Sequence, residues 1–138
     1  VKYKAHEGTR LPYEDNSFDC VYAICVMHHV PPRQWEEFIA EMSRVVKPGG
    51  IVAIYEHNPF NPLTQYIVRT CPIDENAVLL RSTKARSLFK TSNLHSIKNN
   101  YILFTPFASK FFRKLDQWLS FLPLGAQYVS WARVPNEH

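Results

Sequence analysis

Short apolar runs alternate with amphipathic stretches along the first part of the chain. Phe18–Val26 is almost continuously apolar, with β-branched and aromatic residues, which predicts a strand buried on both faces. From Pro32 to Val46, apolar residues recur every three or four positions and predict a helix with one apolar face. Pro48-Gly49-Gly50 is expected to stop this helix, and Ile51–Tyr55 to form the next strand. The pattern therefore predicts a βαβ unit with parallel strands and a right-handed crossover.

The pattern is weaker after Glu56, but it still predicts five elements. They are helices at Asn61–Thr70, Thr83–Ser92 and Ser109–Leu122, and strands at Leu94–Thr105 and Gln127–Val134. A short strand is also predicted at Val1–His6, ahead of a turn-rich loop. The helix at Ser109–Leu122 has a strongly apolar face flanked by basic residues. That face either covers the sheet or acts as a lid or a membrane-surface helix.

Composition places the 138 residues in one domain. With 46% hydrophobic and 20% charged residues, the chain is neither disordered nor collagen-like. No uncharged apolar run approaches the roughly 20 residues that span a bilayer. Cys20, Cys25 and Cys71 contain no CxxC pair, and an odd number of cysteines without metal spacing predicts reduced thiols in a cytoplasmic protein.

Charge is unevenly distributed along the chain. Residues 1–75 carry a net charge of −3, and residues 76–138 a net charge of +7. A basic half suits a phosphate, a nucleic acid or an anionic membrane, although a solvated basic surface explains it as well. The basic half has no recognisable motif that reads nucleic acid, so no nucleic-acid partner is expected.

Four motifs follow one another in the first part of the sequence. They are Glu7–Tyr13 (EGTRLPY), Asp15–Asp19 (DNSFD), Val26–Val30 (VMHHV) and Glu41–Gly50 (EMSRVVKPGG). Together they resemble the middle of a class I S-adenosylmethionine (SAM)-dependent methyltransferase. Each motif alone is weak, but the four in this order form a specific signal. Glu56–Pro62 and Leu124–Tyr128 also resemble this family.

The resemblance implies an α/β fold with a partial Rossmann-like sheet. That sheet would hold strands 3 to 7 of the family order 3-2-1-4-5-7-6, with the seventh strand antiparallel. Residues 1–138 would form a single partial methyltransferase domain, with a cofactor-side βαβ portion at 1–57 and an acceptor-side portion at 58–138.

The family's first cofactor-binding motif has no counterpart in this sequence. The glycine-rich turn after the first strand and the acidic residue ending the second strand are both absent from the 138 residues. We therefore expect a fragment of a longer enzyme, weak or inactive alone. We also expect Phe18–Val26 to be an apolar sheet edge that pairs with a partner or a second copy in a homo-oligomer.

SAM is the cofactor that the resemblance implies. The cofactor-binding residues carried over from the family are Glu7, Gly8, Thr9, Ala23, Ile24 and Cys25. Glu7 would accept a hydrogen bond from the adenine amino group, and the backbone amides of Gly8 and Thr9 would face the ring nitrogens. The other three would line the methionine or ribose side through backbone contacts.

Methyl transfer is an in-line displacement that needs an aligned nucleophile and often a base. His28, His29 and His57 are the candidate catalytic residues, because imidazole titrates near neutral pH. Alternatively, one of the paired histidines packs against the following helix, and His57 is an ordinary loop residue. Glu56 is another candidate base or substrate anchor. No metal site is expected, because Cys25, His28 and His29 lack a second half-site with zinc spacing.

Two hypotheses of function follow. The first is SAM-dependent methyl transfer to a small-molecule, lipid-linked or glycan-linked acceptor. The alternative is a non-catalytic binding or pseudo-enzyme module that uses the basic aromatic helix on a membrane or a protein partner.

Overall fold

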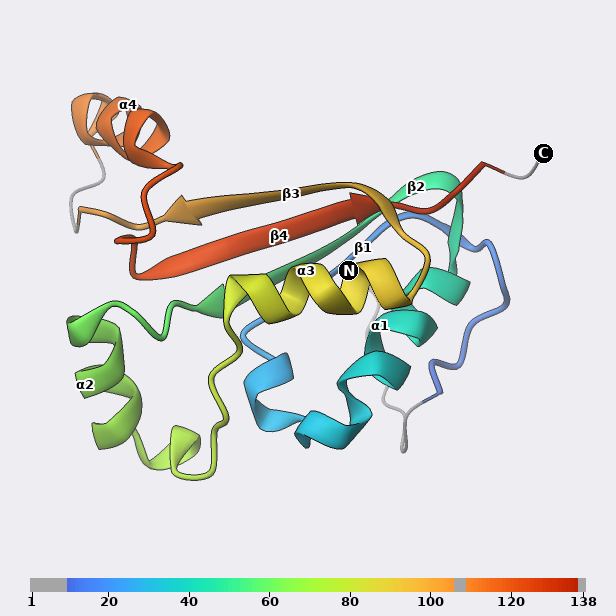
Figure 1. The fold of residues 1–138 in the computed structure, drawn as a ribbon, viewed down its shortest axis with the longest axis horizontal. Coiled ribbons are helices and arrows are strands. Elements are labelled where there is room, and N and C mark those ends of the chain that lie inside the picture. Colours follow the sequence, from blue (N-terminus) through green and yellow to red (C-terminus); the bar gives the residue numbers. More distant parts are fainter. Residues whose placement is uncertain (1–9, 106–108, 137–138) are drawn as a thin grey trace.

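The computed structural model describes residues 10–105 and 109–136 (Figure 1). Its strands and helices are β1 (Phe18–Ile24), α1 (Trp35–Arg44), β2 (Val46–His57), α2 (Pro62–Thr70), α3 (Ser82–Thr91), β3 (His95–Ile102), α4 (Lys110–Leu119) and β4 (Gln127–Arg133). Single 3-10 turns lie at Met27–His29, Pro32–Gln34 and Pro72–Asp74. Every element predicted within the described residues is confirmed, with shifted ends. The strand predicted at Val1–His6 lies outside them.

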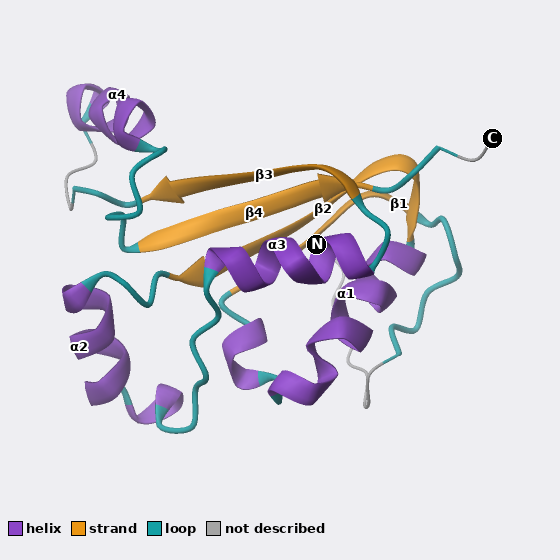
Figure 2. Ribbon diagram, in the orientation of Figure 1, coloured by secondary structure: helices purple, strands orange, loops and turns teal. Residues whose placement is uncertain are grey.

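The described strands form one mixed sheet in the order β1-β2-β4-β3. β1 runs parallel to β2, whereas β4 runs antiparallel to both β2 and β3 (Figure 2). This is the order of strands 4, 5, 7 and 6 in the family sheet, with the last strand of the chain antiparallel. The expected α/β fold with a partial Rossmann-like sheet is therefore confirmed.

The core lies between one face of the sheet and helices α1 and α3 (Figure 1). Because side chains alternate along a strand, Val52 and Ile54 of β2 point into this layer and are fully buried. Ile39 of α1 and Phe89 of α3 pack there, also fully buried. This packing fixes the carboxyl ends of β1 and β2, where the family places its site.

The opposite face of the sheet carries an open apolar groove of about 420 Å³. Its lining residues are Cys20, Tyr22, Ile24, Ile51, Ala53, Tyr55, Val129 and Trp131. Tyr22 is 63% exposed and Ile24 is 56% exposed. Within the described residues, β1 pairs only with β2 and stands at the edge of the sheet. The prediction of an apolar strand at an edge is thus confirmed for β1.

The predicted helix end at Val46 is wrong. α1 ends at Arg44, and Val46 already belongs to β2. The cause is tertiary: the Val45 carbonyl accepts the amides of Ser17 and Phe18, which draws the chain into the sheet. Pro48-Gly49-Gly50 accordingly lies inside β2 at an irregularity in the ladder, where Gly49 adopts a φ of +75° and donates its amide to the Val134 carbonyl.

α4 does not cover the sheet. It projects beyond the end of β3, away from α1 and α3 (Figure 1). No residue of this helix is buried; Phe111 is 71% exposed and Trp118 is 73% exposed. The interpretation of its apolar face as core is therefore wrong, and the lid or surface interpretation stays open. In the described part of the chain, no helix has the length and apolar character needed to cross a bilayer.

Candidate active site

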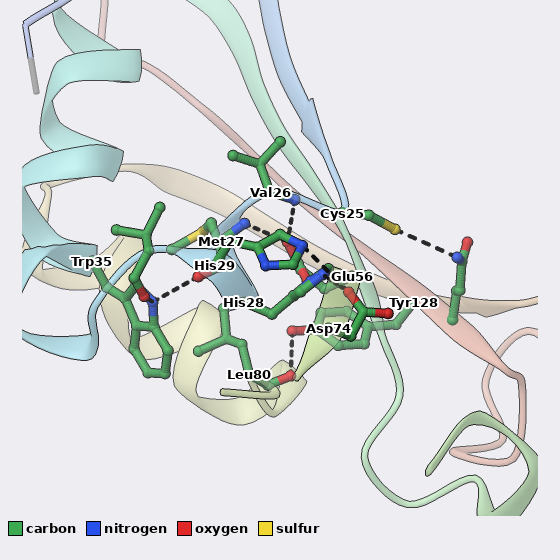
Figure 3. Close-up of polar contacts among 12 residues, drawn as sticks. Cys25, Val26, Met27, His28, His29, Trp35, Glu56, Asp74, Leu80 and Tyr128 are labelled. Atoms are coloured by element: carbon green, nitrogen blue, oxygen red, sulfur yellow. Dashed lines mark hydrogen bonds and ion pairs between the residues drawn. The ribbon is translucent and has the colours of Figure 1, made fainter. Parts of the chain in front are cut away.

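The chain turns sharply where β1 ends. Cys25 adopts a left-handed backbone with a φ of +53°, which is uncommon for a residue other than glycine. Its amide still donates to the Tyr55 carbonyl of β2, at 2.8 Å. This turn shortens the strand predicted to reach Val26, and it points the next two amides at Glu56. Val26 and Met27 donate to Glu56 Oε1 at 3.1 and 2.8 Å (Figure 3).

Glu56 and His28 form a buried pair. Glu56 is completely buried at the end of β2, and its Oε2 lies 2.6 Å from Nδ1 of His28, which is 2% exposed. The other ring nitrogen of His28, Nε2, lies 3.5 Å from Oδ1 of Asp74. Burial by itself lowers the pKa of His28. The hydrogen bond and charge of Glu56, with those of Asp74, outweigh this effect and leave the pKa raised.

Asp74 reaches this pair from the 3-10 turn after α2. Its Oδ1 lies 3.3 Å from Nε2 of His29, which is 40% exposed. The His28 and His29 rings are 4.2 Å apart between centroids, and the His57 ring is 5.1 Å from that of His28. The three histidines singled out in the sequence therefore meet in one cluster at the carboxyl ends of β1 and β2.

His57 differs from the other two histidines. No hydrogen-bond partner of its ring is found among residues 10–105 and 109–136, whereas His28 and His29 both face Asp74. Burial lowers the pKa of His57, and the neighbouring His28 lowers it further. A neutral imidazole with free ring nitrogens can accept a proton.

The structure describes three of the six cofactor-binding residues that the family resemblance implies. Ala23 is buried, with its side chain in the core, so it can offer only its backbone. Ile24 faces the open groove, and Cys25 is half-buried, with its Sγ accepting from Gln127 Nε2 at 3.5 Å. Burial and then the charges of Glu56 and Asp74 raise the pKa of the Cys25 thiol. The remaining three, Glu7, Gly8 and Thr9, lie outside the described residues.

The turn that carries His28 is held from several sides. Trp35 Nε1 donates to the carbonyls of Met27 and Val30, each at 2.9 Å. The carbonyl of His28 accepts from the Val78 amide at 2.8 Å. Trp35 appeared in the sequence only as part of an apolar stripe. Asp74 carried no local signal at all, because a long connection brings it to the histidines.

The site lies at the carboxyl ends of two parallel strands, in a sheet with the methyltransferase strand order. The model of the family described as "Methyltransferase domain" matches residues 1–54, which include β1 and most of β2. This match supports a class I SAM-dependent methyltransferase, the family that the chain resembles over residues 1–54. SAM is the cofactor of this family.

Two curated methyltransferases are similar in sequence to this chain over part of their length. The chain is 37% identical over 82 residues to the demethylmenaquinone methyltransferase of Renibacterium salmoninarum, covering 55% of the chain and 34% of the relative. It is 43% identical over 56 residues to a sterol 24-C-methyltransferase of Gibberella zeae, covering 41% of the chain and 14% of the relative. The chain thus spans about a third or less of the length of these two relatives.

A solved structure shows the same fold. The chain superposes on a SAM-dependent methyltransferase from Thermotoga maritima with a TM-score of 0.68, covering 91% of this chain and 59% of that one. The sequence identity is only 18%, so this similarity supports the fold and gives no information about the substrate.

Proposed function

We propose that this protein transfers a methyl group from SAM to a small-molecule or lipid-linked acceptor at the carboxyl ends of β1 and β2. The observation that carries the proposal is the cluster of three histidines at the turn where β1 ends. SAM supplies a methyl group on a sulfonium, which is reactive enough that alignment and proton removal account for most of the catalysis. This chain's residues then have two tasks: to position the reactants and to take a proton.

The cofactor side of the site is assigned to residues 1–57. At the edge of the described sheet, β1 leaves the outward backbone groups of Ala23–Cys25 free of a partner strand, and these fit the polar methionine and ribose groups of SAM. Residues 58–138 form the acceptor side. They include α4, which lies beside the end of β3.

His57 is assigned as the base. Both ring nitrogens of His28 and Nε2 of His29 lie beside carboxylates, whereas neither ring nitrogen of His57 has a hydrogen-bond partner among the described residues. Glu56 is buried and accepts hydrogen bonds from two amides and from His28, which makes it a positioning residue.

The direct test of the proposed function is to incubate the chain with SAM and measure the release of S-adenosylhomocysteine in the presence of quinol and sterol acceptors.

We further propose that the 138-residue chain alone turns over slowly. In the proposed site, the described residues would line only one side of SAM, and they leave an apolar groove and the β1 edge open. A turnover of about one per second or more from the pure chain, typical of an enzyme, would contradict this proposal.

The open edge of β1 is also proposed to pair with a partner or with a second copy of the chain. Sedimentation equilibrium tests self-pairing, and a monomer over the whole accessible concentration range would exclude it.

A second function, membrane or protein binding through α4, is favoured by one observation. Phe111 and Trp118 are both more than two-thirds exposed, and the exposed Lys110, Arg113 and Lys114 lie on the same short helix. Such a helix suits an anionic membrane surface. The names of the two relatives, which act on a demethylmenaquinone and a sterol, also agree with an acceptor that resides in membranes.

Liposome sedimentation tests the membrane role of α4. The double variant Phe111→Ala, Trp118→Ala is expected to weaken binding to anionic vesicles by at least about tenfold, because two aromatic side chains no longer enter the interface. A matched control, Leu63→Ala with Tyr66→Ala, removes two apolar side chains of similar exposure from α2 and should leave binding unchanged. Equal loss in both double variants would show that α4 has no special role.

A further inference from the structure

We propose that His28, His29 and Asp74 form a binding site for a divalent transition-metal ion, with zinc the best match. Each residue offers one ligand atom, and the three atoms all lie within 4.8 Å of one another. Asp74 Oδ1 is 3.5 Å from His28 Nε2 and 3.3 Å from His29 Nε2. Two ligand atoms on a tetrahedral zinc ion, each about 2.0–2.1 Å from it, are about 3.3 Å apart. The two distances to Asp74 match that spacing, and the two imidazole nitrogens lie within 4.8 Å of each other.

The surroundings of His28 match those of a metal-ligating histidine. Its Nδ1 lies 2.6 Å from the buried Glu56 Oε2 (Figure 3). With the Nδ1 proton donated to this carboxylate, Nε2, which faces Asp74, is the ring nitrogen that can bind a metal ion. Glu56 is in turn fixed by the amides of Val26 and Met27. A carboxylate behind a histidine in this way fixes the tautomer and the ring orientation that a metal needs.

The ligand set also indicates which ion would bind. Two imidazoles and one carboxylate suit zinc and its transition-metal neighbours, whereas magnesium and calcium prefer all-oxygen sites. Three protein ligands leave one coordination position open, which can take water or an acceptor oxygen. His29 is 40% exposed, so solvent reaches the site.

The sequence analysis expected no metal, because Cys25, His28 and His29 lack a second half-site with zinc spacing. The fold supplies the third ligand from a distant turn, where no spacing rule would find it. The proposal does not depend on methyl transfer, because the ion would bind whether or not the chain acts on SAM.

Calorimetric titration of the 138-residue chain with Zn²⁺, together with the visible spectrum of bound Co²⁺, tests the site. We expect one ion per chain, a Co²⁺ spectrum without a thiolate band, and no displacement by excess Mg²⁺. His29→Ala and Asp74→Asn should each weaken binding by at least about tenfold, and Glu56→Gln by about 10–100-fold through His28. His95→Ala, which removes an exposed histidine outside the cluster, should change nothing.

If Glu56→Gln folds poorly, His29→Ala and Asp74→Asn still test the site, because His29 and Asp74 are less buried than Glu56. Circular dichroism of each variant verifies the fold. Absence of Zn²⁺ binding up to about millimolar concentration, which corresponds to only about 4 kcal/mol, would overturn the proposal. So would affinity unchanged in both His29→Ala and Asp74→Asn, or a Co²⁺ spectrum dominated by a thiolate.

Discussion

Glu56→Ala is expected to lower the free energy of unfolding by about 3–5 kcal/mol, the usual cost of removing one partner from a buried ionic pair. The substitution leaves His28 buried without its carboxylate, and it leaves the amides of Val26 and Met27 without an acceptor. The loss should be largest around the turn after β1, because all three donors lie there. Urea denaturation followed by tryptophan fluorescence measures it.

Glu14→Ala is the control for this experiment. Glu14 lies exposed in the loop before β1, and its substitution should change stability by no more than about 0.5 kcal/mol. Glu56→Gln keeps one oxygen for the two amides and should fall between the wild type and Glu56→Ala. If Glu56→Ala unfolds at the same urea concentration as Glu14→Ala, the buried pair does not hold the turn.

His57→Ala is expected to reduce the rate of methyl transfer by about 10²–10⁴-fold, the usual contribution of a general base. The loss should appear in kcat, and the affinity for SAM should stay unchanged, because His57 is assigned to the acceptor's proton and not to the cofactor. The measurement is S-adenosylhomocysteine release under single-turnover conditions, which also detects a slow chain.

The exposed histidine His95 provides the matched control, since His95→Ala removes an imidazole far from the cluster. A mutant rate within about threefold of wild type for His57→Ala would remove His57 from the mechanism, because a general base contributes far more. The proposed methyl transfer could still stand in that case, resting on alignment alone.

The elements of this fold were largely predictable because their signals are local. The apolar run at Phe18–Val26 predicted β1, and the apolar residues that recur every three or four positions predicted α1. Both patterns involve only residues close together in the sequence. The boundary between α1 and β2 was not predictable in this way. The Val45 carbonyl pairs with Ser17 and Phe18, and this tertiary contact overrides the helical pattern at Val46. The order of the strands came from the family resemblance and not from periodicity.

The position of α4 shows a second limit of the sequence. Its apolar stripe is the pattern of a core helix, yet Phe111 and Trp118 are exposed in the described structure. The periodic spacing of apolar residues shows that one face of a helix is apolar, but it does not show which part of the protein, if any, covers that face.

The candidate site was predictable in part. His28 follows β1 and His57 is the last residue of β2. The carboxyl ends of these two parallel strands lie side by side, so the proximity of the two histidines could be expected. Their different surroundings could not, because the burial of His28 depends on Glu56 and on packing around Trp35. Asp74 was missed entirely, since only the folded connection after α2 brings it to the histidines.

The most direct test of the central claim is a titration of the ¹⁵N-labelled 138-residue chain with SAM, followed by amide chemical shifts. If the carboxyl end of β1 forms the cofactor side of a methyltransferase site, the amides of Ile24, Cys25 and Val26 should shift progressively as SAM is added. Amides of α4 should stay in place and serve as the internal control. A folded chain whose amides at the end of β1 do not respond to SAM, or respond only at α4, would contradict the account.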